Sequence, residues 1–305
     1  MSDALRLGTR GSALARWQAE WVAANLRRAG TDVEIVLIRT QGDVRSGPIG
    51  HLGSQGIFTK EIQHALLDDR IDIAVHSLKD LPTDPVDGLR ISAVPPRESP
   101  GDVLVSRGGV PFDALPSGAV IGTGSMRRQA QLLHVRHDVI VRGIRGNVET
   151  RLRQLDEGSY DAVVMAEAGL KRLGLSGRVT QVLPKSWMLP AVGQGALAIE
   201  ARCDDERTHE RVACLDDPET HRGVQAERVL LASLHGGCLA PVGAWGRVED
   251  GHLHLNAAVL DMKGTTRLSV HLVGLPERSE ELGREAARRL LGHGAGDLIS
   301  AARGR

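Results

Sequence analysis

The stretch IDIAVHSLKDLPT, residues 71–83, decides how the first part of the chain folds. Its apolar first half has the length of one buried strand, and Pro82 ends the element that follows. Two earlier apolar runs, at 4–10 and 32–40, are also strand-like, and helical patterns over 12–28 and 59–69 separate the three runs. Strands that alternate with helices predict right-handed βαβ units and a mostly parallel sheet.

A second α/β set follows the segment VPPRESPGD, residues 94–102, whose prolines and glycine predict a connection between domains. The predicted strands of this set lie at 120–124, 139–145 and 161–166, and its helices begin at Ser125 and Asn147 and pass through 169–174. LPAVGQG, residues 189–195, predicts a second connection, after which ALAIEA, residues 196–201, returns to the first sheet. Two crossings predict a body of two α/β lobes.

The pattern changes at about Pro218 and predicts a small α+β domain. A helix over 220–234 precedes hairpin-like strands around 248–252 and 260–266, and a helix over 277–291 follows. The predicted domains are therefore residues 1–95 with 196–215, residues 101–190, and residues 218–305.

The composition of the 305-residue chain argues against several classes of protein. Its 38 basic residues balance 38 acidic ones, so no net field recruits nucleic acid or an anionic membrane. We identify no signal peptide, and no run approaches the roughly 18 apolar residues of a membrane span. Three scattered cysteines, Cys203, Cys214 and Cys238, do not make a disulfide framework, so we expect a cytoplasmic protein.

Asp80 and Lys79 follow the predicted strand of the opening stretch. The carboxyl ends of strands in such sheets face the ligand crevice, where a carboxylate can stabilise positive charge that develops on a substrate. The simpler interpretation is that Asp80 only begins a turn before Leu81 and Pro82.

Arginines gather at the predicted strand-to-helix junctions of the second lobe. Seven arginines and two acidic residues lie between Gly122 and Arg153. Arg127 and Arg128 fall in a first helical turn, where cations are unfavourable unless an anion binds, and the helix N-terminus itself suits an anion. Such clusters are most often a solvated basic face, but this placement favours binding of carboxylates or phosphates. Further candidates for anion binding are Arg145 and Arg151 in this lobe and Arg10 in the first lobe. Arg172 is another, although it could equally serve as a positive charge at a helix C-terminus. Phe58 could cover a flat ring of a ligand, but packing in the core is its more common role.

LHGGCLAPVGA, residues 234–244, carries Cys238 after two glycines and without any zinc-ligand spacing, so we predict no metal site. A free cysteine is usually a small buried apolar residue, but glycines leave this sulfur open and favour a covalent attachment point. A hydrolase that uses Cys238 with His235 is a further alternative.

Together these motifs resemble the porphobilinogen deaminase (hydroxymethylbilane synthase) family nearly from end to end. The matching stretches are LGTRGSALARWQA, GDV, GIFTKEIQHALL, DIAVHSLKDLPT, GTGSMRRQAQL, RGNVETRL, AGLKRLG, LPAVGQGALAIE and GGCLAPVGA. The resemblance implies an α/β fold, with two periplasmic-binding-protein-like lobes plus a small α+β C-terminal domain. It implies a cytoplasmic, monomeric transferase of tetrapyrrole (haem) biosynthesis that joins four porphobilinogen molecules head to tail and releases ammonia and hydroxymethylbilane.

The resemblance also implies roles for particular residues. Cys238 would hold a dipyrromethane cofactor through a thioether, and Asp80 would be the catalytic group that stabilises positively charged pyrrole states. The other residues expected to bind the cofactor are Lys79, Thr123, Ser125, Arg127, Arg128, Arg145 and Gly146. The residues expected to bind the substrate are Arg10, Ser12, Phe58, Arg145, Arg151, Arg172 and Gln194.

The chain departs from the family pattern at three positions: His51 and Gln55 replace frequent lysines, and Gly124 replaces a frequent serine. The catalytic aspartate, the paired arginines and the cysteine are present, so we predict an active enzyme. The main alternative is a non-enzymatic two-lobed anion-binding protein, which would leave Asp80 and Cys238 unexplained.

Overall fold

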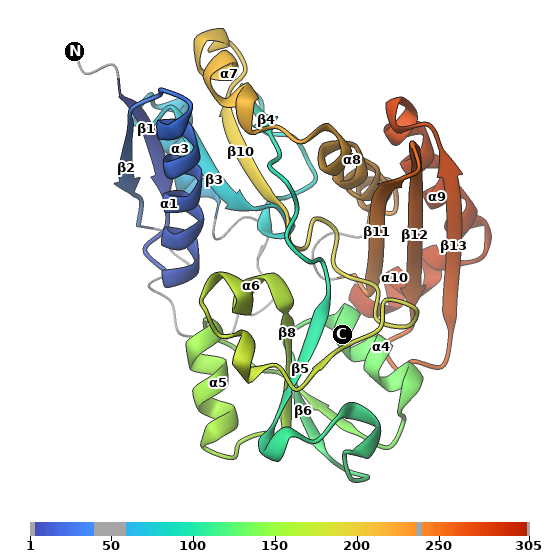
Figure 1. Cartoon of the computed structure of the whole chain (residues 1–305). Helices are drawn as coiled ribbons and strands as arrows, with labels where there is room; N and C mark the ends of the chain where they lie inside the picture. Colours follow the sequence, from blue (N-terminus) through green and yellow to red (C-terminus); the bar gives the residue numbers. More distant parts are fainter. Residues whose placement is uncertain (1–3, 40–58, 236–239, 304–305) are drawn as a thin grey trace. The chain divides into compact units, whose positions relative to one another are not determined.

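A computed structural model describes residues 4–39, 59–235 and 240–303 (Figure 1). Phe58, His51, Gln55 and Cys238 lie outside the described residues, so their predicted roles are not addressed by the structure. The chain divides into two compact units, one of Met1–Glu98 with Ala196–His221 and one of Ser99–Gly195 with Arg222–Arg305. The second unit thus joins the predicted second and third domains, and the three-domain division stays a prediction.

The first unit has a five-stranded sheet in the order β2-β1-β3-β10-β4. The strands are β1 (Leu5–Thr9), β2 (Val33–Leu37), β3 (Ile73–Ser77), β4 (Leu89–Ala93) and β10 (Leu197–Arg202). Its helices are α1 (Ala13–Arg28), α3 (Lys60–Leu67) and α7 (Glu206–Val212). Apolar residues of α1 pack against β1, β3 and β10 on one face, and those of α3 pack against the other face.

One strand of this sheet runs against the rest. β1 pairs in parallel with β2 and β3, whereas β10 is antiparallel to both β3 and β4. A parallel neighbour requires a crossover connection, usually a helix, but β10 enters from the second connecting segment without one. The return of 196–201 to the first sheet is confirmed, and the mostly parallel sheet carries one reversed strand.

The second unit repeats this arrangement in a sheet of order β7-β6-β8-β5-β9. The strands are β5 (Asp102–Ser106), β6 (Val120–Gly122), β7 (Ile140–Arg142), β8 (Ala162–Ala166) and β9 (Gln181–Val182). The helices are α4 (Met126–Val135), α5 (Val148–Asp156) and α6 (Glu167–Arg172). The reversed strand is β5, which follows the first connecting segment directly and pairs antiparallel with β8 and β9.

The rest of the second unit is an antiparallel sheet, β11-β12-β13, that packs against helices. Its elements are α8 (Pro218–Ser233), whose first four residues belong to the first unit, β11 (Val242–Glu249), β12 (His252–Leu260), β13 (Arg267–Gly274), α9 (Ser279–Gly292) and α10 (Ala295–Arg303). The two predicted hairpins are confirmed, because β11 pairs with β12 and β12 with β13 in antiparallel register. The α/β lobes and the α+β C-terminal part agree with the predicted fold class.

The described part of the chain has no helix that is both long and apolar enough to cross a membrane. Within the same residues, no group of three or more histidine, cysteine, aspartate or glutamate side chains is placed to hold a metal ion.

Candidate active site

Asp80 lies on a single 3-10 turn, Leu78–Asp80, at the carboxyl end of β3. The buried side chain of Leu78 anchors this turn, and the Leu78 amide donates to the Ala196 carbonyl at 3.0 Å. The side chain of Asp80 itself is exposed, and that of Lys79 is half-buried. The strand and its turn therefore present Asp80 to solvent on a fixed backbone.

Arg10 and Ser12 come to the same edge of the sheet, because β1 and β3 are parallel neighbours that pair Leu7 with Ile73 and Gly8 with Ala74. Ser12 is the N-cap of α1, and its hydroxyl accepts from the Ala15 amide at 3.3 Å. The first lobe thus brings Arg10, Ser12, Lys79 and Asp80 to one edge of its sheet.

A buried polar cluster lies beside this strand and was not predicted. His76 Nε2 lies 3.0 Å from Glu200 Oε2, and Gln63 Nε2 donates to Glu200 Oε1 at 3.0 Å. All three side chains are about nine-tenths buried or more, so these contacts connect β3, β10 and α3 inside the unit. They fix the strand that carries Asp80.

The candidate residues of the second lobe begin at α4. Ser125 caps the helix and its hydroxyl accepts from the Arg128 amide at 3.5 Å, while Thr123 Oγ1 accepts from the Ser125 amide at 3.2 Å. The two arginines that follow are buried: Arg127 is 4% exposed and Arg128 is 6% exposed. Two positive charges buried in the first turn of a helix, beside the positive end of its dipole, are destabilising unless a negative charge lies close to them.

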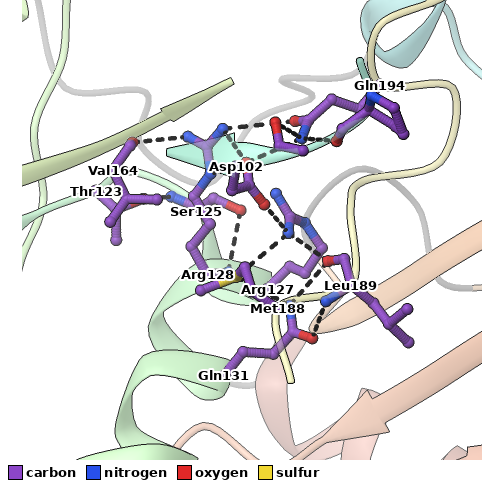
Figure 2. A network of polar contacts seen from close by, with 12 residues as sticks. Asp102, Thr123, Ser125, Arg127, Arg128, Gln131, Val164, Met188, Leu189 and Gln194 are labelled. Atoms are coloured by element: carbon purple, nitrogen blue, oxygen red, sulfur yellow. Dashed lines mark hydrogen bonds and ion pairs between the residues drawn. The ribbon is translucent and has the colours of Figure 1, made fainter. Parts of the chain in front are cut away.

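That compensation comes from Asp102, the first residue of β5, which is fully buried (Figure 2). Arg127 Nη1 donates to Asp102 Oδ2 at 2.6 Å. Arg128 donates to Asp102 Oδ1 from Nε at 2.9 Å and from Nη2 at 2.8 Å. One carboxylate thus holds both guanidinium groups.

The pKa of Asp102 reflects this position. Burial alone would raise it, but the charges of Arg127 and Arg128 and hydrogen bonds from Arg127 and Gln194 lower the pKa well below its ordinary value. Asp102 is therefore ionised at neutral pH. One carboxylate against two guanidinium groups leaves this buried cluster with an excess positive charge.

Gln194 joins the same network from the second connecting segment. Its Nε2 donates to the Pro100 carbonyl at 2.7 Å and to Asp102 Oδ1 at 2.9 Å, and its Oε1 accepts from Arg128 Nη2 at 3.5 Å. The side chain is fully buried. The structure thus places this predicted substrate-binding residue within an internal network.

Arg145, Gly146 and Arg151 lie around the beginning of α5. β7 is parallel to β6, so the chain after β7 leaves the sheet at the same edge as α4. Gly146 has a φ of 108°, which favours glycine, and its carbonyl accepts from Arg151 Nε at 2.9 Å. The side chain of Arg145 is exposed. Arg172, the last residue of α6, donates from Nη2 to the Gly195 carbonyl at 2.7 Å.

Sequence reasoning did not identify Asp102 as a functional candidate. It lay within the segment interpreted as a connection, although the apolar run VLV directly after it is typical of a buried strand. An acidic residue that opens such an apolar strand, in a chain with a cluster of arginines, is the sequence signal that would have found it.

Comparisons with known proteins agree with the resemblance in the sequence. The family described as porphobilinogen deaminase, dipyromethane cofactor binding domain, matches residues 5–210, and the porphobilinogen deaminase C-terminal domain matches residues 222–292. A porphobilinogen deaminase of Desulforudis audaxviator is 52% identical over 300 residues, covering 97% of each chain. One of Geobacter metallireducens is 46% identical over 299 residues, covering 97% of this chain and 94% of the relative.

Among solved structures, a periplasmic sulfonate-binding protein of Methylobacillus flagellatus is similar with a TM-score of 0.38 and 17% identity. The similarity covers 77% of this chain and 69% of that chain.

Proposed function

This chain belongs to the porphobilinogen deaminase family, and from that premise we propose how its residues perform the family's reaction. The enzyme is a transferase of tetrapyrrole biosynthesis that uses a dipyrromethane cofactor and porphobilinogen as substrate. Four porphobilinogen molecules are condensed head to tail with loss of ammonia, and hydrolysis releases hydroxymethylbilane. The family match does not support the alternative of a non-enzymatic anion-binding protein.

The donor set around α4 fits a cofactor that carries several carboxylates. Arg127 Nε is buried and has no hydrogen-bond partner among the described residues. The cluster of Asp102 with two arginines has excess positive charge, and the N-terminus of α4 adds a partial positive charge. An anionic ligand beside this cluster would accept a hydrogen bond from Arg127 Nε and offset the excess positive charge. We therefore assign to the cofactor's acetate and propionate groups the residues Thr123, Ser125, Arg127, Arg128, Arg145 and Gly146. We assign Lys79 and Asp80 to its pyrrole rings.

When bound, the dipyrromethane supplies an electron-rich pyrrole carbon to which the incoming unit is joined. Porphobilinogen loses ammonia as its aminomethyl C–N bond breaks and the electron pair leaves with nitrogen. Positive charge then develops on the substrate's pyrrole ring, and it would be lost when the substrate's methylene carbon bonds to that pyrrole carbon, which would release its own hydrogen as a proton. We assign to Asp80 the role of accepting hydrogen bonds from pyrrole N–H groups and stabilising that charge.

The substrate's own carboxylates need separate donors. Arg10 and Ser12 in the first lobe, and Arg145 and Arg151 in the second, are the proposed ones, because charge-assisted bonds from guanidinium groups suit carboxylates. Arg172 and Gln194 were predicted to share this role. Since both donate to main-chain carbonyls in the structure, we propose that they act by holding the connecting segments.

We propose that Cys238 carries the cofactor through a thioether, since the sequence GGC matches the family's attachment motif. Phe58 stays a candidate for contact with the substrate. We also propose that the protein acts in the cytoplasm, because the Cys238 thiol must stay reduced until the cofactor is attached. We further propose that it acts as a monomer, as the resemblance to the family implies.

The family match carries this proposal, and the intact mass of the denatured protein tests it. We expect an excess mass equal to two condensed pyrrole units, located by peptide mapping on Cys238. If the mass is unmodified, porphobilinogen is added and the protein is weighed again. Persistent absence of an adduct and of hydroxymethylbilane would overturn the proposal.

A further inference from the structure

We propose that Asp102 is a positioning residue that holds Arg127 and Arg128 in the orientation required to bind the cofactor. The inference rests on the proposed function, because that function assigns these arginines to ligand carboxylates. Asp102 would act through the arginines and would not contact the ligand itself.

The first argument is the way the contacts fix the two side chains. Arg128 is held on two sides, since Nε and Nη2 donate to Asp102 Oδ1 while Nη1 donates to the Val164 carbonyl at 3.0 Å. Arg127 Nη1 donates both to Asp102 Oδ2 and to the Leu189 carbonyl, each at 2.6 Å. Figure 2 shows that the carboxylate of Asp102 lies between the two guanidinium groups. Their orientation is thus fixed within the unit by direct contacts to the protein, with Asp102 common to both.

The second argument is electrostatic. Two buried guanidinium groups repel each other. Without a carboxylate from the protein, nothing would offset this repulsion before the anionic ligand binds. Burial lowers the pKa of Arg127, and the neighbouring charge of Arg128 acts in the same direction, while Asp102 opposes both effects. Asp102 neutralises one of the two charges and leaves the other for a ligand.

The third argument is where Asp102 is anchored. Asp102 is the last residue of the first connecting segment and the first residue of β5, and Gln194 and Leu189 belong to the second segment. Gln194 Nε2 joins the two segments through the Pro100 carbonyl and Asp102 Oδ1. The arginine pair is therefore held by residues of both segments, and Asp102 is the group that contacts both arginines and Gln194.

The test is Asp102→Asn, which keeps the volume but replaces one acceptor oxygen with an amide group that donates. We expect the fraction of purified protein that carries the cofactor, measured by intact mass, to fall about tenfold or more. In the loaded remainder, we expect KM for porphobilinogen to stay close to that of the parent, because the proposed substrate donors are unchanged.

Two controls separate positioning from stability. Asp161→Asn makes the same change in the same lobe, where Asp161 Oδ2 accepts from the Val120 amide at 2.8 Å at the beginning of β6. Gln131→Leu removes a fully buried amide on α4 that bonds Leu189 and not Asp102. Both variants should lose stability in urea and keep cofactor loading within about threefold of the parent.

A double variant tests whether Asp102 acts through the arginines. If it does, the fold-loss of loading in Asp102→Asn combined with Arg128→Leu is smaller than the product of the two single fold-losses, because only the contact of Asp102 with Arg127 then remains to be lost. Loading of Asp102→Asn equal to that of the controls, or full additivity in the double variant, would overturn the inference while leaving the proposed function intact. A parent protein without any cofactor or turnover would instead overturn the proposed function.

Discussion

Asp80 and Arg127 show how differently two functional candidates can be held. Asp80 is exposed at the end of a strand, and its backbone is fixed by a buried neighbour, Leu78. Arg127 is 4% exposed and is held by a carboxylate and a main-chain carbonyl. A substitution at Asp80 should therefore affect chemistry alone, whereas one at Arg127 should affect folding as well.

We predict that Asp80→Asn lowers kcat about 100-fold or more, because the amide no longer offers a negative charge to the pyrrole ring. Its free energy of unfolding in urea should stay within about 0.5 kcal/mol of the parent, since the side chain is exposed. Cofactor attachment should remain possible. Normal formation of hydroxymethylbilane by this variant would remove Asp80 from the mechanism.

Arg127→Leu should lower the free energy of unfolding by about 3–5 kcal/mol, because it leaves Asp102 buried with half of its charge compensation lost. The sequence indicated only a ligand-binding role for Arg127, from which little loss of stability would be expected. The burial of Arg127 changes that expectation for stability. Urea unfolding of Arg127→Leu and of Arg151→Leu compares the loss of unfolding free energy at the two positions. We expect the smaller loss at Arg151, whose side chain is only half-buried.

The lowered pKa of Asp102 gives its contribution a definite pH dependence. The folded protein holds this carboxyl ionised below the unfolded pKa of about 3.9, so its contribution is complete above that pH and is lost as the pH falls toward the folded pKa. The difference in unfolding free energy between the parent and Asp102→Asn should therefore be largest at neutral pH and shrink below about pH 4. A difference that grows on acidification would contradict this assignment.

Three of the predicted helices begin at capping residues that the sequence shows. Ser12, Ser125 and Asn147 were expected to begin helices, and each is the N-cap of its helix with a side-chain oxygen that accepts a main-chain hydrogen bond. The strands β4, β5 and β9 and the helices α7 and α10 were not predicted, although Asp205 caps α7. Two-residue β9 exists only because β5 supplies its partner, which is tertiary information.

The cap at Asn147 can be tested alone. Asn147→Ala removes the acceptor of the Thr150 amide, 2.9 Å away, and should cost about 1 kcal/mol of stability. Asn147→Ser keeps a hydroxyl acceptor and should cost only a few tenths of that amount. Urea midpoints of the two variants provide the comparison, and equal losses would mean that the side chain of Asn147 has another role.

At the scale of the whole molecule, the sequence predicted two crossings and a two-lobed body because proline- and glycine-rich segments interrupt the strand and helix pattern. It did not predict how those segments are used. Arg127, Gln131 and Glu227 all bond to residues 189–193, and no local pattern in the sequence indicates contacts between positions so far apart.

Glu227 connects the C-terminal part of the second unit to the second connecting segment. Its side chain is fully buried and accepts from the Gly193 amide and the Gly246 amide, each at 2.7 Å. Glu227→Ala should cost at least about 2 kcal/mol, because two buried N–H groups lose their acceptor. We expect one shifted urea transition for the second unit. A separate early transition of β11–β13 would mean that this sheet unfolds independently.

The place of β10 in the first sheet has a consequence for synthesis on the ribosome. β10 lies between β3 and β4, yet it is made after the whole of the second lobe. While residues 1–98 emerge, β3 and β4 lack the strand that joins them, and the buried pair of His76 and Gln63 lacks Glu200. The sheet of the first lobe therefore keeps an unpaired edge on β3 until β10 has been synthesised. The sheet of the second lobe is the first of the two to have all its strands available.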